Sequence, residues 1–209
     1  MASALSRLDK FPVKPRIMWC MFCLECSVES FEPRSGKPLE INCFLENHET
    51  SVCRACFGEG YSYCKPAAAG MLGDAQDLTD VLEWVESLLF SGTDEYRVAV
   101  LTAVQRLCAC FVTAEAEHRK FHGIGELCGD GNWKDYHAVL AQRRQLVGYG
   151  EDGHLKPLRL LPGDDGYMAL AAAKQRFWEY IQPIVKEQHG KKGHPGDEYC
   201  PFPRVLSML

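Results

Sequence analysis

The sequence contains no long apolar run and no stretch that looks like a secretory leader. The first residues, MASALSRLDKFPVKPR, mix charge with proline and lack the apolar core of a signal peptide. No segment has the roughly 18 consecutive apolar residues that span a bilayer, and the apolar segment 81–90 is interrupted by Glu83 and Glu86. We therefore expect an intracellular protein, nuclear or cytoplasmic, that has no membrane partner.

The chain also lacks the short motifs of common enzyme classes. It has no G-x-S-x-G, no H-E-x-x-H and no P-loop. Gly148, Gly150 and Gly153 match G-x-G-x-x-G, but a predicted helix precedes them and none opens at the third glycine, so they do not indicate a dinucleotide site. The H-x-E and P-C-x-x-C pattern of zinc deaminases is missing as well. These absences favour a non-catalytic protein and leave the question of catalysis open.

Basic charge is scarce for a protein that would act mainly by neutralising phosphates. The 209 residues include 23 Lys and Arg against 28 Asp and Glu, which gives a net charge of −5. Residues 1–16 form a basic arm with Arg7, Lys10, Lys14 and Arg16 against Asp9. The stretch 20–64 is acidic, with seven glutamates against three basic side chains. The charges therefore divide the N-terminal third of the chain into two unlike parts.

Cysteine, in contrast, is abundant and clustered. Two residues between cysteines allow both thiolates of a tight turn to bind one ion, and two such turns complete a tetrahedron around Zn²⁺. Thiols stay reduced inside cells, so the cluster predicts metal binding rather than a disulfide framework, with unligated core cysteines as the alternative. Seven of the eleven cysteines lie within residues 20–64, namely Cys20, Cys23, Cys26, Cys43, Cys53, Cys56 and Cys64.

From Cys23 onward the chain reads C-x2-C-x16-C-x9-C-x2-C-x7-C, which resembles the fungal Zn2Cys6 cluster over about a fifth of the chain. The resemblance implies two zinc ions and a nuclear, transcription-linked role, with a short helix in the major groove of DNA. The first spacer, SVESFEPRSGKPLEIN, is longer than the family's and acidic where the family relies on Lys and Arg, so specific DNA binding is doubtful. The implied ligands are Cys23, Cys26, Cys43, Cys53, Cys56 and Cys64.

Two other arrangements stay open. With His48 included, the stretch resembles a RING finger, which implies a ubiquitin ligase scaffold; the eighth ligand is then missing at Ala67 unless Cys20 supplies it. The C-x2-C-x2-C run also resembles part of a ferredoxin-type iron–sulfur site, with Cys200 before a proline as the remote ligand. In that run the next expected ligand falls at Ser30.

Apolar periodicity predicts four helices after residue 73. The first covers about residues 77–90, the second runs from residue 94 toward His122, the third covers 132–147, and the fourth covers 167–188 with Pro183 inside it. Cys108 and Cys110 lie in the second helix, where we expect them to pack in the core. We interpret two loose sets as surface residues, namely His118, His122 and Cys128, and His189, His194 and Cys200.

The sequence therefore predicts a mostly α protein with four parts. These are a basic arm at 1–16, a Cys-rich zinc module at 17–66, an all-α bundle of about four helices at 74–188, and a tail at 189–209. The module is too short to bury much apolar surface, so the metal's binding energy is its folding energy. We expect one or two Zn²⁺, with Cys20 and His48 as further candidate ligands. The predicted function is that of a protein-interaction adaptor or regulator.

Overall fold

The computed structural model describes residues 19–45, 51–88, 94–125, 131–150, 153 and 155–189. Within these residues it contains six α-helices, two short 3-10 helices and isolated β-bridges in place of strands. The prediction of a mostly α protein, with a Cys-rich region followed by helices, is confirmed. The basic arm, His48, Cys128, His194 and Cys200 lie outside the described residues.

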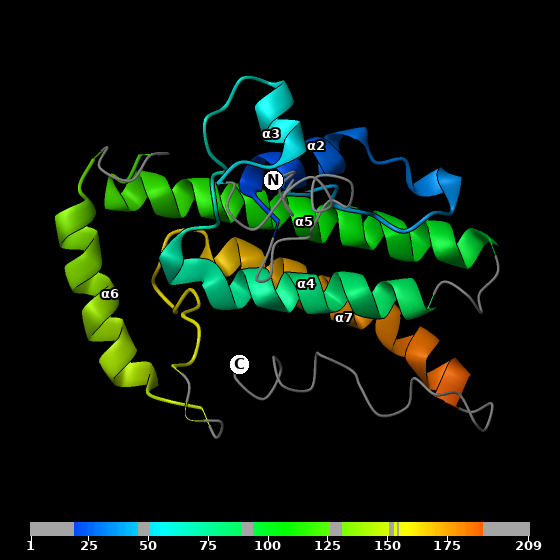
Figure 1. The fold of residues 1–209 in the computed structure, drawn as a ribbon. Coiled ribbons are helices and arrows are strands. Elements are labelled where there is room, and N and C mark those ends of the chain that lie inside the picture. The colour runs from blue at the N-terminus through cyan, green and yellow to red at the C-terminus, as the bar shows by residue number, and fades with distance from the viewer. Residues whose placement is uncertain are drawn as a thin grey trace.

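Helix α5, Asp94–His122, is the central element of the fold. Helices α4, Leu72–Leu88, and α7, Tyr167–His189, pack along it, and α2, Met21–Ser30, lies on its other side (Figure 1). The short helix α3, Arg54–Gly58, stands beyond α2, and α6, Trp133–Val147, stands at one end of α5 (Figure 1). The buried face of α5 repeats every three or four residues, at Val100, Leu101, Val104, Leu107, Cys108 and Phe111.

Residues Tyr96–His122 of α5 are long and apolar enough to cross a membrane, by length and composition only. The criterion of roughly 18 consecutive apolar residues misses this segment, because Thr102, Gln105 and Arg106 interrupt the apolar run without making the helix polar on average. In this structure α5 packs against α2, α4 and α7. A core helix of this kind meets the same length and composition criterion as a membrane span.

Helix α4 begins at Leu72, five residues before the position that periodicity predicts. It follows the 3-10 helix η2, Ala69–Met71. Asp74 explains the earlier start, because a carboxylate in the first turn of a helix interacts favourably with the positive end of the helix dipole. The same carboxylate accepts a hydrogen bond from the backbone N–H of Leu160, at 2.8 Å. Apolar periodicity does not detect these polar contacts.

A partly buried group of charges joins α4 to α7 and to the segment before α7. The Lys174 ammonium lies 2.7 Å from a carboxylate oxygen of Asp74 and 3.2 Å from one of Asp77. Arg159 donates to both carboxylate oxygens of Asp77, at 3.0 and 2.7 Å. Two carboxylates therefore face two cations, which is the condition under which buried charges are tolerated.

A second buried polar group connects α5 to the segment that follows the last cysteine of the module. Glu115 is 1% exposed and accepts hydrogen bonds from the Ala68 N–H, at 3.1 Å, and from Arg119, at 2.5 Å. Arg119 also donates to the backbone carbonyls of Pro66, at 2.8 Å, and Gly125, at 2.9 Å. This ion pair therefore fixes the chain between the cysteines and α4 onto α5.

His118 and Tyr136 extend this polar group to α6. The Tyr136 hydroxyl lies 3.0 Å from His118 Nε2 and accepts a hydrogen bond from the Gly70 N–H, at 2.8 Å. Burial lowers the pKa of His118 to about 4, so the ring is neutral and Nε2 can accept a hydrogen bond from the Tyr136 hydroxyl. Gly70 has no room for a side chain, since a Cβ there would lie 2.9 Å from His118 Nε2.

The segment between Cys23 and Cys43 lies along α5. The side-chain amide of Gln105, on α5, donates to the backbone carbonyls of Val28 and Phe31, both at 3.1 Å. The 3-10 helix η1, Pro33–Ser35, follows and also contacts α5. Trp19 packs edge-on against Phe111, with ring centroids 5.6 Å apart. The long spacer noted in the sequence is therefore the part that docks on the bundle.

Candidate metal centre

Two C-x2-C pairs, Cys20 with Cys23 and Cys53 with Cys56, each lie at the start of a helix. Cys20 is the N-cap of α2 and Cys53 is the N-cap of α3. The second cysteine of each motif, Cys23 or Cys56, is then the third residue of the helix, on the same side as the cap. The N-terminus of a helix favours negative charge, so each pair of thiols lies where a thiolate is stabilised.

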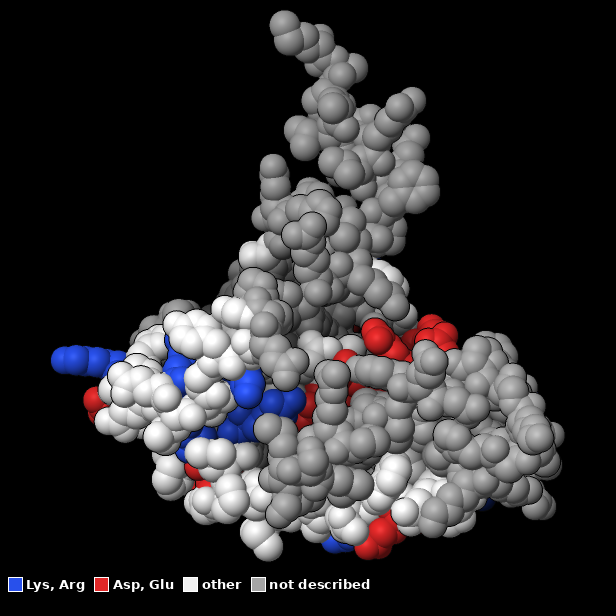
Figure 2. Space-filling model, turned by 90° about the horizontal axis from the view of Figure 1, so that it is seen from below, with Lys and Arg blue, Asp and Glu red and all other residues white. Residues whose placement is uncertain are grey.

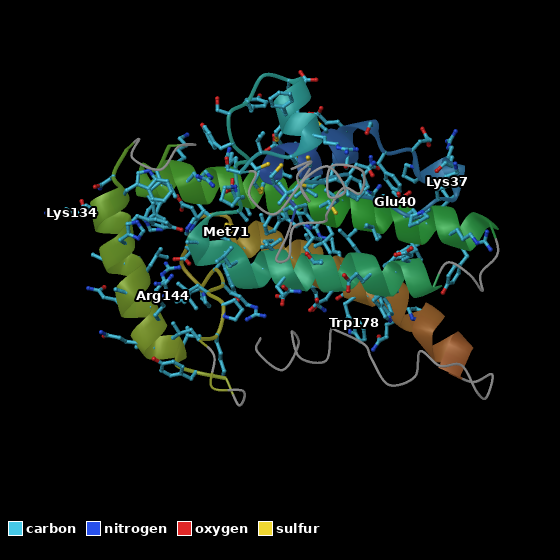
Figure 3. The ribbon with its side chains drawn as sticks, in the orientation of Figure 1. Lys37, Glu40, Met71, Lys134, Arg144 and Trp178 are labelled. Carbon is cyan, nitrogen blue, oxygen red and sulfur yellow. The ribbon has the colours of Figure 1, made fainter. Side chains whose placement is uncertain are left out.

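The six sulfur atoms that converge form two groups of four. One group contains Cys20, Cys23, Cys53 and Cys56, and the other contains Cys20, Cys43, Cys53 and Cys64. Within each group all the sulfur atoms lie within 4.8 Å of one another. Figure 3 shows sulfur atoms gathered in this region, between α3 and α5. The two groups share Cys20 and Cys53, which are the two helix N-caps.

The spacing of the sulfur atoms suits a tetrahedral metal. A Zn–S bond of about 2.3 Å places the corners of a tetrahedron roughly 3.8 Å apart. The Cys23 and Cys53 sulfurs are 3.4 Å apart, and the Cys20 and Cys56 sulfurs are 3.5 Å apart. A disulfide bond is about 2.05 Å long, so these pairs are not bonded to each other.

Backbone N–H groups point at the sulfur atoms. Cys53 N–H donates to the Cys64 sulfur at 3.0 Å, and Cys56 N–H donates to the Cys53 sulfur at 3.4 Å. Cys20 N–H donates to the Cys43 sulfur at 3.4 Å. Donors of this kind stabilise thiolates and orient metal ligands. The backbone is thus arranged for negatively charged sulfur.

Six thiols packed this closely cannot all ionise without a cation. Hydrogen bonds from the Cys23 and Cys43 thiols lower the pKa of Cys20 to about 2. The hydrogen bond between Cys20 and Cys23 is also the main cause of the raised pKa of Cys23. Burial raises the pKa of Cys64 to about 12. One thiolate is therefore stabilised at the expense of its neighbours. A bound cation removes this competition, because it deprotonates every thiol that coordinates it.

Burial makes this a closed site. Cys20, Cys23, Cys43, Cys53 and Cys56 are each no more than 3% exposed, and Cys64 is half-buried. Thiolate-only sites with a complete shell are structural, whereas a catalytic zinc keeps one position open to water or substrate. The arrangement can hold metal and fix two helices, and its donors leave no position for a substrate.

The structure brings together five of the six ligands that the sequence favours. These are Cys23, Cys43, Cys53, Cys56 and Cys64, and Cys20 joins them. Cys26 belongs to neither group, and its side chain is exposed. Cys108 is buried in α5 and Cys110 is half-buried, in line with the expected packing role. His118 is buried, contrary to the surface position expected for it, because its ring nitrogen bonds Tyr136.

Helical phase could have separated Cys20 from Cys26. Cys20, Cys23 and Leu24 recur at the three- and four-residue spacing of one helix face, and all three are buried. Cys26, three residues after Cys23, lies about 120° around the helix from Cys20, beyond the edge of this buried face, and its side chain is exposed. Of the two C-x2-C pairs in the run C-x2-C-x2-C, Cys20 with Cys23 is therefore the pair that shares a buried helix face with an apolar residue.

Comparisons of the chain with protein-family models, curated proteins and solved structures found no match. The geometry of the cysteine groups is therefore the main guide to function.

Proposed function

We propose that residues 20–64 hold two Zn²⁺ ions in one six-thiolate cluster. Cys20 and Cys53 bridge the ions, Cys23 and Cys56 complete one tetrahedron, and Cys43 and Cys64 complete the other. The observation that carries the proposal is that two four-sulfur groups share two members. Two separate sites of the RING type would need eight ligands, because each ion would take four of its own.

The donor set supports zinc. Thiolate-only tetrahedral sites take Zn²⁺ or iron–sulfur clusters. Cys20, Cys23 and Cys26 would have to converge in the ferredoxin-like arrangement, whereas the Cys26 side chain is exposed and outside both groups. Two ions and six thiolates carry a net charge of about −2, which the backbone N–H donors and the N-termini of α2 and α3 offset in part.

The function that this module supports is that of a protein-interaction adaptor or regulator. Metal holds α2 and α3 to each other, and the surface that these helices present is acidic and aromatic. An acidic module is poorly suited to bind phosphates, so a protein partner is favoured over specific DNA binding. Figure 2 shows Lys and Arg gathered at the α6 end of the molecule, on the face away from the module. A nuclear, transcription-linked setting follows from the resemblance to the fungal cluster.

Metal content of ligand variants tests the shared-ligand arrangement. We expect two zinc ions per chain by native mass spectrometry and metal analysis, with a colourless sample. Replacement of an outer ligand, Cys64→Ser, should leave about one ion, because the group of Cys20, Cys23, Cys53 and Cys56 stays complete. Replacement of a bridging ligand, Cys53→Ser, should reduce both sites.

Cys26→Ser is the matched control, since it removes a thiol of the same module that belongs to neither sulfur group and should keep both ions. Loss of an ion in Cys26→Ser, or equal losses in the Cys53 and Cys64 variants, would contradict the proposed ligand set. An absorption band near roughly 400 nm would indicate iron–sulfur instead.

A further inference from the structure

The outer side of the module carries an exposed aromatic face. Phe57, on α3, is 71% exposed, and Tyr61, just after α3, is 46% exposed. Tyr61 contacts Phe22 of α2, with ring centroids 5.2 Å apart. Phe57 lies four residues before Tyr61, and Phe22 is half-buried. Large exposed aromatic side chains are typical of binding surfaces. We call Phe22, Phe57 and Tyr61 the aromatic face.

Carboxylates border the aromatic face. Glu25 and Glu29 lie three and seven residues after Phe22 on α2, which places them on the same side of the helix. Glu59 directly follows α3. Burial and then the charges of Glu29, Glu25 and Glu59 raise the pKa of the Cys26 thiol, so carboxylates of α2 and of the end of α3 act on the same side chain. The face is therefore apolar at its centre and negative at its edge.

Aromatic rings bordered by carboxylates favour a positively charged occupant. Lys and Arg side chains pair with carboxylates and also stack on aromatic rings, so a basic segment with apolar residues fits the face. A second copy of the face would bring carboxylates against carboxylates, which opposes self-association through it. Arg54 is the basic residue of α3 itself, and it lies at the helix end away from Glu59.

We propose that the chain's own basic arm, residues 1–16, binds the aromatic face. The arm carries Arg7, Lys10, Lys14 and Arg16 against Asp9, together with the apolar residues Leu5, Leu8, Phe11 and Val13. It ends three residues before Trp19, which precedes the first residue of the metal cluster. The inference rests on the proposed zinc module, because metal is what holds α3 and its aromatic side chains in place.

The tether makes this contact sterically and energetically accessible. Lys10 is ten residues from Cys20, so it can reach up to about 33 Å from the start of α2, whereas the whole of α2 is only about 15 Å long. A short tether also gives an effective concentration of about millimolar, at which weak ion pairs and one aromatic contact suffice.

Photo-crosslinking within the full-length, zinc-loaded chain tests the contact. The photoreactive residue p-benzoylphenylalanine replaces Phe11, and cross-linked sites are identified by mass spectrometry at low protein concentration. We expect intrachain cross-links to residues 55–61. The yield should fall at least about threefold in Glu29→Lys/Glu59→Lys, in Phe57→Ala and at high salt, because the edge is electrostatic and the centre is aromatic.

The matched control is Glu83→Lys/Glu86→Lys, which makes the same charge change on exposed positions of α4 and should leave the yield unchanged. Cross-links to other segments, links between two copies, or equal yields in the Glu29/Glu59 and control variants would overturn the proposal. Zinc content is measured on the same samples. Two ions without cross-links to 55–61 refute the arm contact alone, whereas absent zinc refutes the proposed function.

Discussion

The cysteine module and the helical bundle bury the same side chain for different purposes. Cys53 in the module and Cys108 in the bundle are both fully buried. Cys108 has apolar surroundings, and burial raises its pKa to about 12, so it remains a neutral thiol. Cys53 belongs to two groups of converging sulfur atoms. Burial alone therefore does not define a ligand, and the neighbouring sulfurs do.

The two regions also differ in how their buried polar atoms find partners. In the bundle, Glu115 pairs with Arg119, and Asp74 with Lys174, so the opposite charge comes from the chain itself. Within the described part of the module, the hydrogen-bond partners of the buried thiols are other thiols and backbone N–H groups. In the proposed assignment the module takes its balancing charge from a bound metal, whereas these buried charges of the bundle are balanced by its own side chains.

Metal removal should give the largest difference between the two regions. Chelation at neutral pH is expected to unfold residues 20–64, since structural zinc contributes on the order of 10 kcal/mol to folding of such modules. Hydrogen exchange measured by mass spectrometry should show loss of protection in α2 and α3, with α5 and α7 still protected. Unchanged protection of residues 20–64, or simultaneous unfolding of both regions, would contradict the prediction that only the module depends on metal.

Removing an internal charge partner should destabilise the bundle by a smaller amount. Glu115→Ala leaves Arg119 buried without its carboxylate and removes the acceptor of the Ala68 N–H, so we expect a loss of about 3–5 kcal/mol in the free energy of unfolding. Chemical denaturation of the zinc-loaded protein measures it. The neighbouring Glu117→Ala, at an exposed position of the same helix, should change stability by less than about 0.5 kcal/mol. Similar values for the two variants would refute the structural role of Glu115.

Acid should weaken the junction of α5 and α6 through His118. Burial lowers its pKa to about 4, and the charges of His122, Arg143 and Arg119 act in the same direction while Asp164 opposes them. The unfolded chain therefore binds the proton more readily than the folded chain. The contribution of neutral His118 to the free energy of unfolding is fully present above about pH 6.5. It is lost as the pH falls toward about 4, and the loss is at most about 3 kcal/mol.

Protection of α5 and α6 amides across this pH range measures the effect. In His118→Gln the pH dependence between 6.5 and 4 should be reduced, whereas His137→Gln, at an exposed position on α6, should keep it. Because loss of zinc in acid is common to all three proteins, the difference between them isolates the junction. An identical pH profile for the wild type and His118→Gln would exclude this role.

The helices of the bundle could be predicted from sequence because each has a regular apolar face. The second predicted helix begins at residue 94 and ends at His122, as the periodicity indicates. The early start of α4 could not be predicted in this way. It depends on the contact between Asp74 and the Leu160 N–H, which are 86 positions apart. Apolar periodicity carries no information about a partner so distant in the chain.

The sequence indicated the candidate site through its cysteine spacing but left the ligand frame open. Spacing treats Cys20 and Cys26 as equivalent ends of one run. The structure separates them, because α2 turns Cys20 toward the module's interior and Cys26 toward Glu25 and Glu29. The sharing of Cys20 and Cys53 could not be predicted either, since it requires the relative placement of α2 and α3.

The long spacer between Cys23 and Cys43 determines whether the module can be transplanted. Gln105 of α5 donates to the carbonyls of Val28 and Phe31 within this spacer, and Trp19 packs on Phe111. Residues 17–66 grafted into another protein would expose those carbonyls and that indole to water. The six candidate metal ligands thus all lie within the module, but the module also depends on contacts with α5. A working chimera must therefore contain the module together with α5.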